Sequence, residues 1–550
     1  IVAGWYRRNL GTEFETAGLP VLYHEYVGHD NNRDWFMILQ PETEAVTRQL
    51  WHEWFPQIVY NHHQTGPFPS RIFIPPFTDP MNPDIPAMVM RGINLVGTAM
   101  GNRFDREGKP GVVSRVQYSV WWNGGMRTAP YFHNQIGILT ETNLYEYATP
   151  HFYPPESLPA WVGSRRGGDI PSDRPSVFYP NPWRGGWWRI GDAVDYMMTG
   201  SMAVADIGAE LREDWLHGMW LMGRQAIEAG EAGRPFAYVI PEEQWDEGEA
   251  RAMVEVLRRG AVEVHRATSD FEAGGERYPA GTWVAFAAQP FRAHLMDLME
   301  PQEYPDRRLY PGGPPDPPYD LAGWTLPIQM GVEVRRVDEP FQAETRPVDE
   351  TGLAVPPGRV SGSGPIHLLS PRQNASYVAV ARLMEAGAAV TRTPSAIEVG
   401  GRTWPPGTYL VQAESEQLEA AALDLGLDFV GAGSLNVAAV PIRRPRIGLY
   451  KSHVASMDEG WTRWLLEQYG LEYETLTDSD VRVGNLSRFH AIVLPDQEAQ
   501  EILNGHPPET MPPEYVGGMG SEGAAALDRW VRGGGTLVAL DHASNFAIDQ

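Results

Sequence analysis

Three polar side chains stand where they could carry out chemistry. His63 follows the apolar run 57–60, Glu141 follows the apolar run 136–139, and Arg33 lies in an Asn-Asn-Arg-Asp cluster. A histidine at the end of a buried strand can offer a ring nitrogen to a metal, because the strand fixes its direction. The planar fork of an arginine suits a carboxylate, and a glutamate at a strand end can act as a general base.

Each of these residues, taken singly, also has a purely structural interpretation. His63 could be a hydrogen-bonded structural histidine, and Glu141 could be a polar residue that ends a strand. Arg33 could form an ordinary ion pair with Asp30 or Asp34. A chemical interpretation therefore depends on their order and spacing along the chain.

The elements that must position these residues alternate between strand and helix patterns. The runs at 57–60 and 136–139 predict buried strands, and apolar residues at helical spacing predict helices over 42–54 and 87–104. One or two further helices are expected over 190–229 as a closing layer. This alternation predicts an α/β domain over residues 1–232.

An internal repeat follows and predicts a duplicated β-α-β region over residues 233–440. Each copy has an apolar run, a helical segment that ends at a glycine, a second run and a Pro-x-Gly-Thr turn. Nearly the same spacing separates Gly260 from Gly281 and Gly387 from Gly407. The proline-rich stretch 304–319 lies between the copies and is expected to be a loop or linker.

Residues 441–550 again alternate between strand and helix patterns, which predicts a parallel, flavodoxin-like sheet. This part resembles class I glutamine amidotransferase-like domains. Those enzymes need a cysteine after such a strand, whereas here Leu540 is followed by Asp541, His542 and Ala543, and the chain has no cysteine. Glutaminase chemistry is therefore excluded, which leaves a binding or packing role.

Composition excludes several classes of partner and site. There are 70 acidic and 44 basic residues, a formal net charge of -26, which disfavours nucleic acid and anionic membrane surfaces. No apolar run approaches the roughly 20 residues of a spanning helix, so no membrane span is expected. The absence of cysteine excludes thiolate zinc sites and cysteine nucleophiles. The sequence gives no indication of an oligomeric state.

In their order, the polar residues of the first domain resemble the C-terminal half of the catalytic domain of the M14 zinc carboxypeptidases, the metallocarboxypeptidase family. The resemblance covers about residues 1–165. It implies a mixed-sheet α/β carboxypeptidase-like domain in which His63 is a Zn²⁺ ligand and Glu141 is the general base and acid. His62 could take the place of His63.

The same resemblance implies how a peptide substrate is held. Asn32 and Arg33 match the pair that binds the terminal carboxylate, and Tyr118, upstream of two glycines, matches a flexible tyrosine that covers the substrate. Arg7 matches the arginine that polarises the scissile carbonyl, and Arg8 could replace it.

One part of the family's pattern is missing. A His-x-x-Glu pair supplies two zinc ligands well before the Asn-Arg pair, and residues 1–31 contain none. His506 and Glu509 have this spacing, but they lie in the last domain with two prolines between them and are not expected to be catalytic. Two explanations stay open: ligands upstream of Ile1, or a metal-free relative.

The sequence therefore predicts a hydrolase, a zinc-dependent metallocarboxypeptidase that releases C-terminal residues from peptides and is incomplete in the chain as given. The resemblance also implies export to the periplasm or outside the cell. A non-catalytic peptide- or glycan-binding relative is the alternative. A glycoside hydrolase using Glu141 would leave the order of the Asn-Arg, His and Glu residues unexplained.

Overall fold

The computed structural model describes residues 1–24, 26, 31–143, 149–163, 170–433 and 435–550. Helices and several open sheets alternate along the chain, so the predicted α/β class is confirmed. The chain forms two compact units, unit 2 with residues 31–353 and unit 1 with residues 1–30 and 354–550. These units differ from the predicted domains 1–232, 233–440 and 441–550, because the two copies of the repeat fall in different units.

The central sheet of unit 2 has the order β1-β6-β2-β4 and is mixed. Strands β1 (Ile58–His63) and β6 (Ile136–Thr142) are parallel, and β2 (Ile72–Phe73) is antiparallel to β6 and parallel to β4 (Val112–Val113). All seven residues of β6 are buried. A strand buried on both faces needs a continuous apolar run, and Ile136 to Leu139 supply it.

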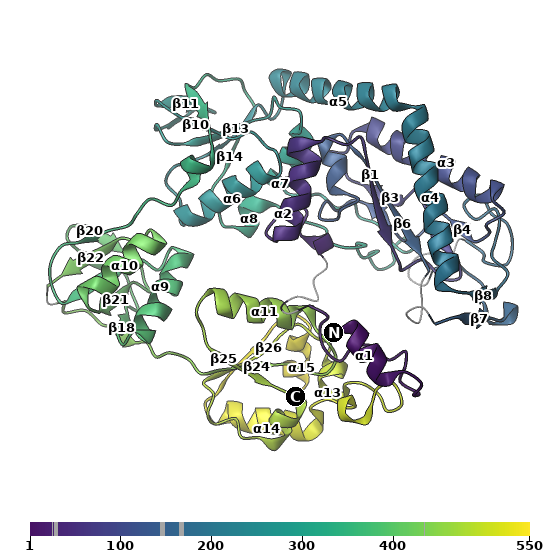
Figure 1. Ribbon diagram of the computed structural model, residues 1–550. Coiled ribbons are helices and arrows are strands. Elements are labelled where there is room, and N and C mark those ends of the chain that lie inside the picture. Colours follow the sequence, from purple (N-terminus) through teal and green to yellow (C-terminus); the bar gives the residue numbers. More distant parts are fainter. Residues whose placement is uncertain (25, 27–30, 144–148, 164–169, 434) are drawn as a thin grey trace. The chain divides into compact units, whose positions relative to one another are not determined.

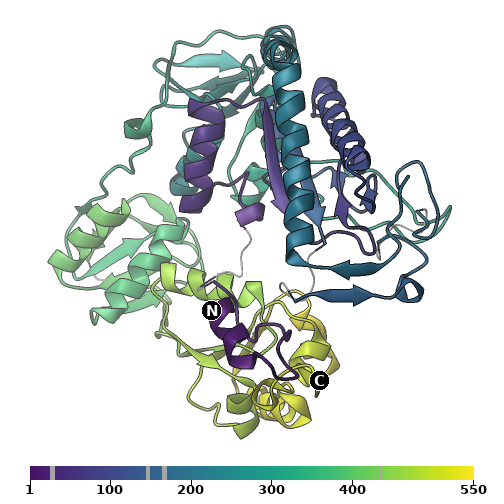
Figure 2. The same ribbon diagram turned by 45° about the vertical axis from the view of Figure 1, so that its right-hand side comes forward.

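Helices cover this sheet along much of its length. Helices α3 (Ala87–Arg106) and α4 (Ile190–Glu210) pack on each other and on β6, as Figures 1 and 2 show. Val89, Ile93, Val96 and Met100 are fully buried in α3 at helical spacing. Helix α5 (Arg212–Ala232) follows α4, and α2 (Pro41–Arg48) continues into a π-helical turn, η2 (Gln49–Glu53). The predicted helices are thus confirmed.

Smaller elements complete this part of unit 2. They are η1 (Asn31–Arg33), β3 (Thr78–Met81), β5 (Ser119–Val120), η3 (Ala129–His133), β7 (His151–Tyr153), η4 (Pro155–Ser157) and β8 (Gly186–Trp188). Strands β3 and β5 pair with each other, as do β7 and β8.

The two copies of the repeat fold alike. In the first, β9 (Ala237–Ile240) and β10 (His265–Ala267) flank β13 (Trp283–Phe286) in antiparallel pairs. In the second, β17 (Ile366–Leu369) and β18 (Ala389–Arg392) flank β21 (Tyr409–Gln412) in the same way.

The turn before the middle strand is equivalent in both copies. Gly281 N–H donates to Ala267 O at 2.9 Å, and Gly407 N–H donates to Thr393 O at 2.8 Å. Both glycines have positive φ, +102° and +86°, a conformation that other residues rarely adopt. This backbone geometry, which the two copies share, explains why each copy has a glycine in this turn.

The other elements of the two repeat sheets flank these central strands. The first sheet lies with α6 (Glu247–Arg259), β11 (Phe271–Ala273), β12 (Glu276–Tyr278), α7 (Arg292–Met299), α8 (Leu326–Gln329), β14 (Arg335–Val337), β15 (Thr345–Pro347) and η5 (Glu350–Leu353). The second lies with β16 (Val360–Ser361), α9 (Asn374–Glu385), β19 (Ile397–Val399), β20 (Arg402–Trp404), α10 (Ser415–Leu425), β22 (Phe429–Ala432) and β23 (Val440–Pro441).

The last sheet, in unit 1, is parallel throughout, as predicted. Its order is β25 (Tyr473–Leu476), β24 (Ile447–Tyr450), β26 (Ala491–Leu494), β27 (Thr536–Ala539). In chain order this is 2-1-3-4, as in flavodoxin-like sheets. The accompanying helices are α11 (Met457–Gln468), α12 (Asp478–Val483), α13 (Ala499–Asn504), η6 (Pro513–Tyr515), α14 (Gly520–Arg532) and α15 (Ala543–Asp549).

A buried carboxyl group joins the segments that follow β3 and β5 to the first repeat copy. Asp297 of α7 is 2% exposed and accepts hydrogen bonds from Asn82 Nδ2, Asn123 Nδ2 and Trp324 Nε1. Burial raises the pKa of Asp297 well above its usual value. Asn82 donates to Oδ1, whereas Asn123 and Trp324 share Oδ2. Because a buried carboxyl group needs these donors, the network fixes three segments against one another.

The neighbouring Asp84 makes the stability of this junction depend on pH. Burial and the charge of Glu300 raise the pKa of Asp84 to about 6, although Arg292 lowers it. The folded pKa thus exceeds the unfolded one. The contribution of Asp84 to the free energy of unfolding is therefore complete below about pH 4, and it is lost as the pH rises through about 6.

We predict that Asp84→Asn raises the free energy of unfolding at pH 7.5 by up to about 2–3 kcal/mol and leaves it unchanged at pH 4, as measured by urea denaturation. Asn cannot ionise, so it avoids the cost of a half-buried charge. Asp105→Asn, at an exposed position of α3, is the control. A stabilisation of the same size at both pH values would contradict this explanation.

Candidate functional site

The parallel pairing of β1 and β6 brings two of the predicted residues together. In its register His62 is opposite Thr140, and His63 is opposite Glu141. Registered residues of neighbouring strands point to the same face of a sheet. His63 Nδ1 accordingly lies 3.4 Å from Glu141 Oε1, and Glu141 is only 4% exposed.

The remaining polar atoms of this pair are held by neighbouring groups. Glu141 Oε2 accepts a hydrogen bond from Thr65 N–H at 2.7 Å, and His63 Nε2 lies 3.0 Å from Asn32 Nδ2. Because the Asn32 amide nitrogen is a donor, Nε2 accepts, and the ring proton belongs on Nδ1, toward Glu141. Asn32, His63, Glu141 and the Thr65 backbone form what we call the His63 cluster.

Two close approaches shape this cluster. Asn32 Oδ1 accepts a hydrogen bond from Met126 N–H, which fixes the amide that faces His63. A Cβ atom on Gly66 would lie 2.7 Å from Glu141 O, so only glycine lets the loop after Thr65 pass the end of β6.

Tyr118 contacts the cluster through the backbone of Thr65. Its ring is 2% exposed and its hydroxyl donates to Thr65 O at 2.8 Å. The ring also lies 4.7 Å from that of Phe73. This burial differs from the flexible cover that the resemblance implies, because the aromatic core of the central sheet encloses the side chain.

Arg33 has a partner that the sequence did not indicate. Its Nη2 lies 3.0 Å from Asp320 Oδ2, and its guanidinium lies 4.9 Å from the centre of the Trp122 ring. Asp34, one of the two acids considered from the sequence, instead accepts from the N–H groups of Leu39 and Gln40. Asp30, the other, lies outside the described residues.

His62 points to a different environment from His63. Its Nε2 lies 3.2 Å from Ser201 Oγ, and its ring lies 4.0 Å from that of Tyr60. Burial lowers the pKa of His62, which favours the neutral ring. Of the two histidines left open by the sequence, His63 is the one that faces Glu141.

The two predicted arginines at the start of the chain lie in the other unit. Arg7 is exposed on α1 (Val2–Asn9), and Arg8 pairs with Glu514 and Tyr515 of unit 1. Arg7 is therefore not part of the unit that contains His63 and Glu141.

The His63 cluster does not complete a zinc site. It offers one imidazole and one carboxylate, whereas catalytic zinc has three protein ligands. Within the described part of the chain, the single group of three close metal-ligating side chains is Asp496, Asp541 and His542 in unit 1, and it is mostly exposed. His506 lies elsewhere in unit 1, with Nε2 2.9 Å from His453 O.

Known proteins add no identification. No protein-family model, curated protein or solved structure matches this chain. The resemblance to zinc carboxypeptidases therefore rests on the residues described above.

In the described ranges no helix is long and apolar enough to cross a membrane.

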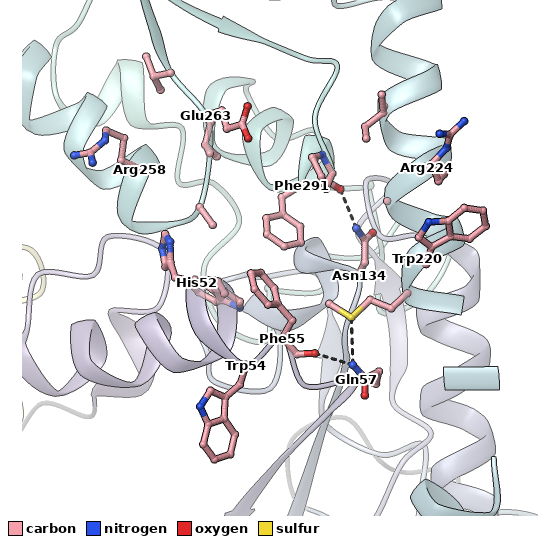
Figure 3. A pocket seen from close by; sticks show the side chains of 18 of the residues that line it. His52, Trp54, Phe55, Gln57, Asn134, Trp220, Arg224, Arg258, Glu263 and Phe291 are labelled. Atoms are coloured by element: carbon pink, nitrogen blue, oxygen red, sulfur yellow. Dashed lines mark hydrogen bonds between the residues drawn. The ribbon is translucent and has the colours of Figure 1, made fainter. Parts of the chain in front are cut away.

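A large cavity lies away from the His63 cluster. It measures about 1050 Å³ and is lined mainly by apolar side chains from η2, α5 and the first repeat copy (Figure 3). Gln57, at its edge, precedes β1, whereas His63 ends β1, and a strand of this length separates them by roughly 20 Å. Gln57 Nε2 donates a hydrogen bond to Phe55 O, and Asn134 Nδ2 donates one to Pro290 O. The volume of this cavity is therefore not a reason to place the candidate site there.

We predict that the 550-residue chain retains no tightly bound zinc after equilibrium dialysis, as measured by elemental analysis, because the cluster supplies a single imidazole. One firmly held zinc per chain that disappears in His63→Ala would contradict this. His542→Ala is the matched control, since it tests the exposed group of unit 1.

Proposed function

We propose that the protein is a hydrolase of the metallocarboxypeptidase type, which releases C-terminal residues from peptides. The proposal includes a carboxypeptidase-like arrangement of the central mixed sheet. It assigns His63 as one zinc ligand, and the other ligands would have to come from outside the His63 cluster. Since the described residues do not complete the zinc site, the steps below involve only side chains of this chain.

The observation that carries the proposal is the 3.4 Å approach of His63 Nδ1 to Glu141 Oε1 at the carboxyl ends of two paired strands. Glu141 can take a proton from water as the water oxygen bonds to the carbon of the last peptide group. It can then return that proton to the leaving nitrogen as the C–N bond breaks. The result is a free amino acid and a shortened peptide.

Arg33 and Asn32 account for selection of the chain end. The Arg33 fork can bind both oxygens of a terminal carboxylate, and the face of Trp122 supports the guanidinium. Asn32 lies between Arg33 and His63 and bonds to both. A site that requires a terminal carboxylate rejects internal peptide bonds.

One observation favours the alternative, a non-catalytic relative that binds peptides or glycans. Both oxygens of Glu141 and both ring nitrogens of His63 already face protein groups, as in a structural network. Under this alternative Arg33 would hold a peptide end that is never cleaved.

We predict that Glu141→Gln lowers the release of C-terminal residues by about 10²–10⁴-fold. Gln retains an oxygen for the Thr65 N–H but cannot accept the proton of the attacking water. Mass spectrometry of a peptide with a free C-terminus measures this, and Glu263→Gln, at the distant cavity, is the control. Undiminished cleavage in Glu141→Gln would show that another group is the base.

A further inference from the structure

The end of the proline-rich stretch and the residues after it, 316–324, run past Arg33 and Tyr118 within unit 2, and we call this segment the strap. Trp121 Nε1 donates to Ala322 O at 3.1 Å, and Trp324 Nε1 donates to Asp297 Oδ2 at 3.0 Å. These bonds anchor the C-terminal part of the strap. Residues 319 and 320, just before the anchors, face the residues of the candidate site.

Asp320 brings a carboxylate to the residue proposed to bind one. Its Oδ2 lies 3.0 Å from Arg33 Nη2, and its side chain is 14% exposed against 43% for Arg33. The group on Arg33 in this structure is thus chemically the same as the end of a peptide substrate. Arg33 can hold it in the geometry that guanidinium and carboxylate prefer.

Tyr319 places an aromatic ring beside the same site. Its ring centre lies 5.4 Å from that of Tyr118 in an edge-on arrangement, and it packs against the core of the central sheet. Burial raises the pKa of Tyr319, the charge of Arg127 lowers it and the charge of Glu141 raises it, so its hydroxyl lies within electrostatic range of the cluster.

The two residues together present an aromatic side chain next to a carboxylate, as a peptide ending in an aromatic residue does. Pro317 and Pro318 precede them. Because proline fixes φ, the strap loses little conformational freedom when it adopts this position.

We propose that Tyr319 and Asp320 occupy the subsite for the C-terminal residue of the substrate, so that a peptide binds by displacing Asp320 from Arg33. This inference rests on the proposed function. It makes Asp320 a specificity-determining residue, because only a ligand with its own carboxylate can replace it. The peptide side chain takes the place of the Tyr319 ring as the strap moves away, which favours a large apolar C-terminal side chain.

Competition with Asp320 weakens binding of the wild type without preventing it. Ion pairs with a partly exposed member are weak, and a substrate carboxylate can replace one. Asp320→Asn removes the competing charge and keeps the shape of the side chain. A free-acid peptide ending in Phe should then bind about fivefold more tightly.

The test is isothermal titration calorimetry of this chain with a short peptide ending in Phe, as the free acid and as the amide. We expect Asp320→Asn to tighten binding of the acid about fivefold and to leave the amide unchanged. Asp316→Asn is the matched control, since Asp316 lies in the same segment and pairs with Arg307 at 3.3 Å. Unchanged affinity for the acid, or equal tightening of acid and amide, would overturn the proposal.

Two further binding measurements examine the roles of Arg33 and Tyr319 separately. Arg33→Met should abolish the preference for acid over amide, and a preserved preference would place the carboxylate elsewhere. In Asp320→Asn, a peptide ending in Phe should bind more tightly than one ending in Ala. Equal affinities would overturn the role of Tyr319.

The binding readout separates this inference from the proposed function. Acid-selective tightening in Asp320→Asn supports the inference even in a protein that cleaves no peptide, and would then favour the binding alternative over the peptidase. Cleavage whose KM is the same in Asp320→Asn and the wild type supports the peptidase and refutes the inference.

Discussion

The parallel pairing of β1 with β6 is the constraint on which the site depends. It fixes His63 beside Glu141, and the buried strand β6 holds that register because its residues pack on both faces. A shift of one residue would turn His63 to the opposite face of the sheet. The hydrogen bonds of Asn32 to His63 and of Thr65 to Glu141 require this register, and Tyr118 in turn bonds to Thr65.

A second constraint, the buried carboxyl group of Asp297, positions the strap beside Arg33. Asp297 binds groups from the segments that follow β3 and β5 and also Trp324 of the strap. The same buried carboxyl group therefore ties the first repeat copy to the segment that brings Asp320 to Arg33. A buried network has this effect because each donor left unpaired would cost stability. In this interpretation the repeat copy helps to build the site, so it is more than an accessory domain.

Much of the fold followed from local patterns. Periodicity located the helices over 42–54, 87–104 and 190–229 and the strands that carry His63 and Glu141. The parallel sheet of the last domain followed from the alternation of strands and helices. The choice of His63 over His62 needed the register of β1 against β6, which no single strand reveals. The pair of Arg33 with Asp320 joins η1 to a loop far along the chain, so no spacing rule could indicate it. The burial of Tyr118 and the placement of Arg7 in unit 1 likewise depend on tertiary contacts.

The central claim is that a peptide binds with its C-terminus at Arg33 and its last peptide bond beside Glu141. A crystal structure of the protein with a bound peptide that carries a free carboxylate tests this most directly. The account predicts the peptide carboxylate on Arg33, with the Asp320 side chain moved away. A peptide bound in the cavity between η2 and α5, or one that leaves the Arg33 and Asp320 pair intact, would contradict it.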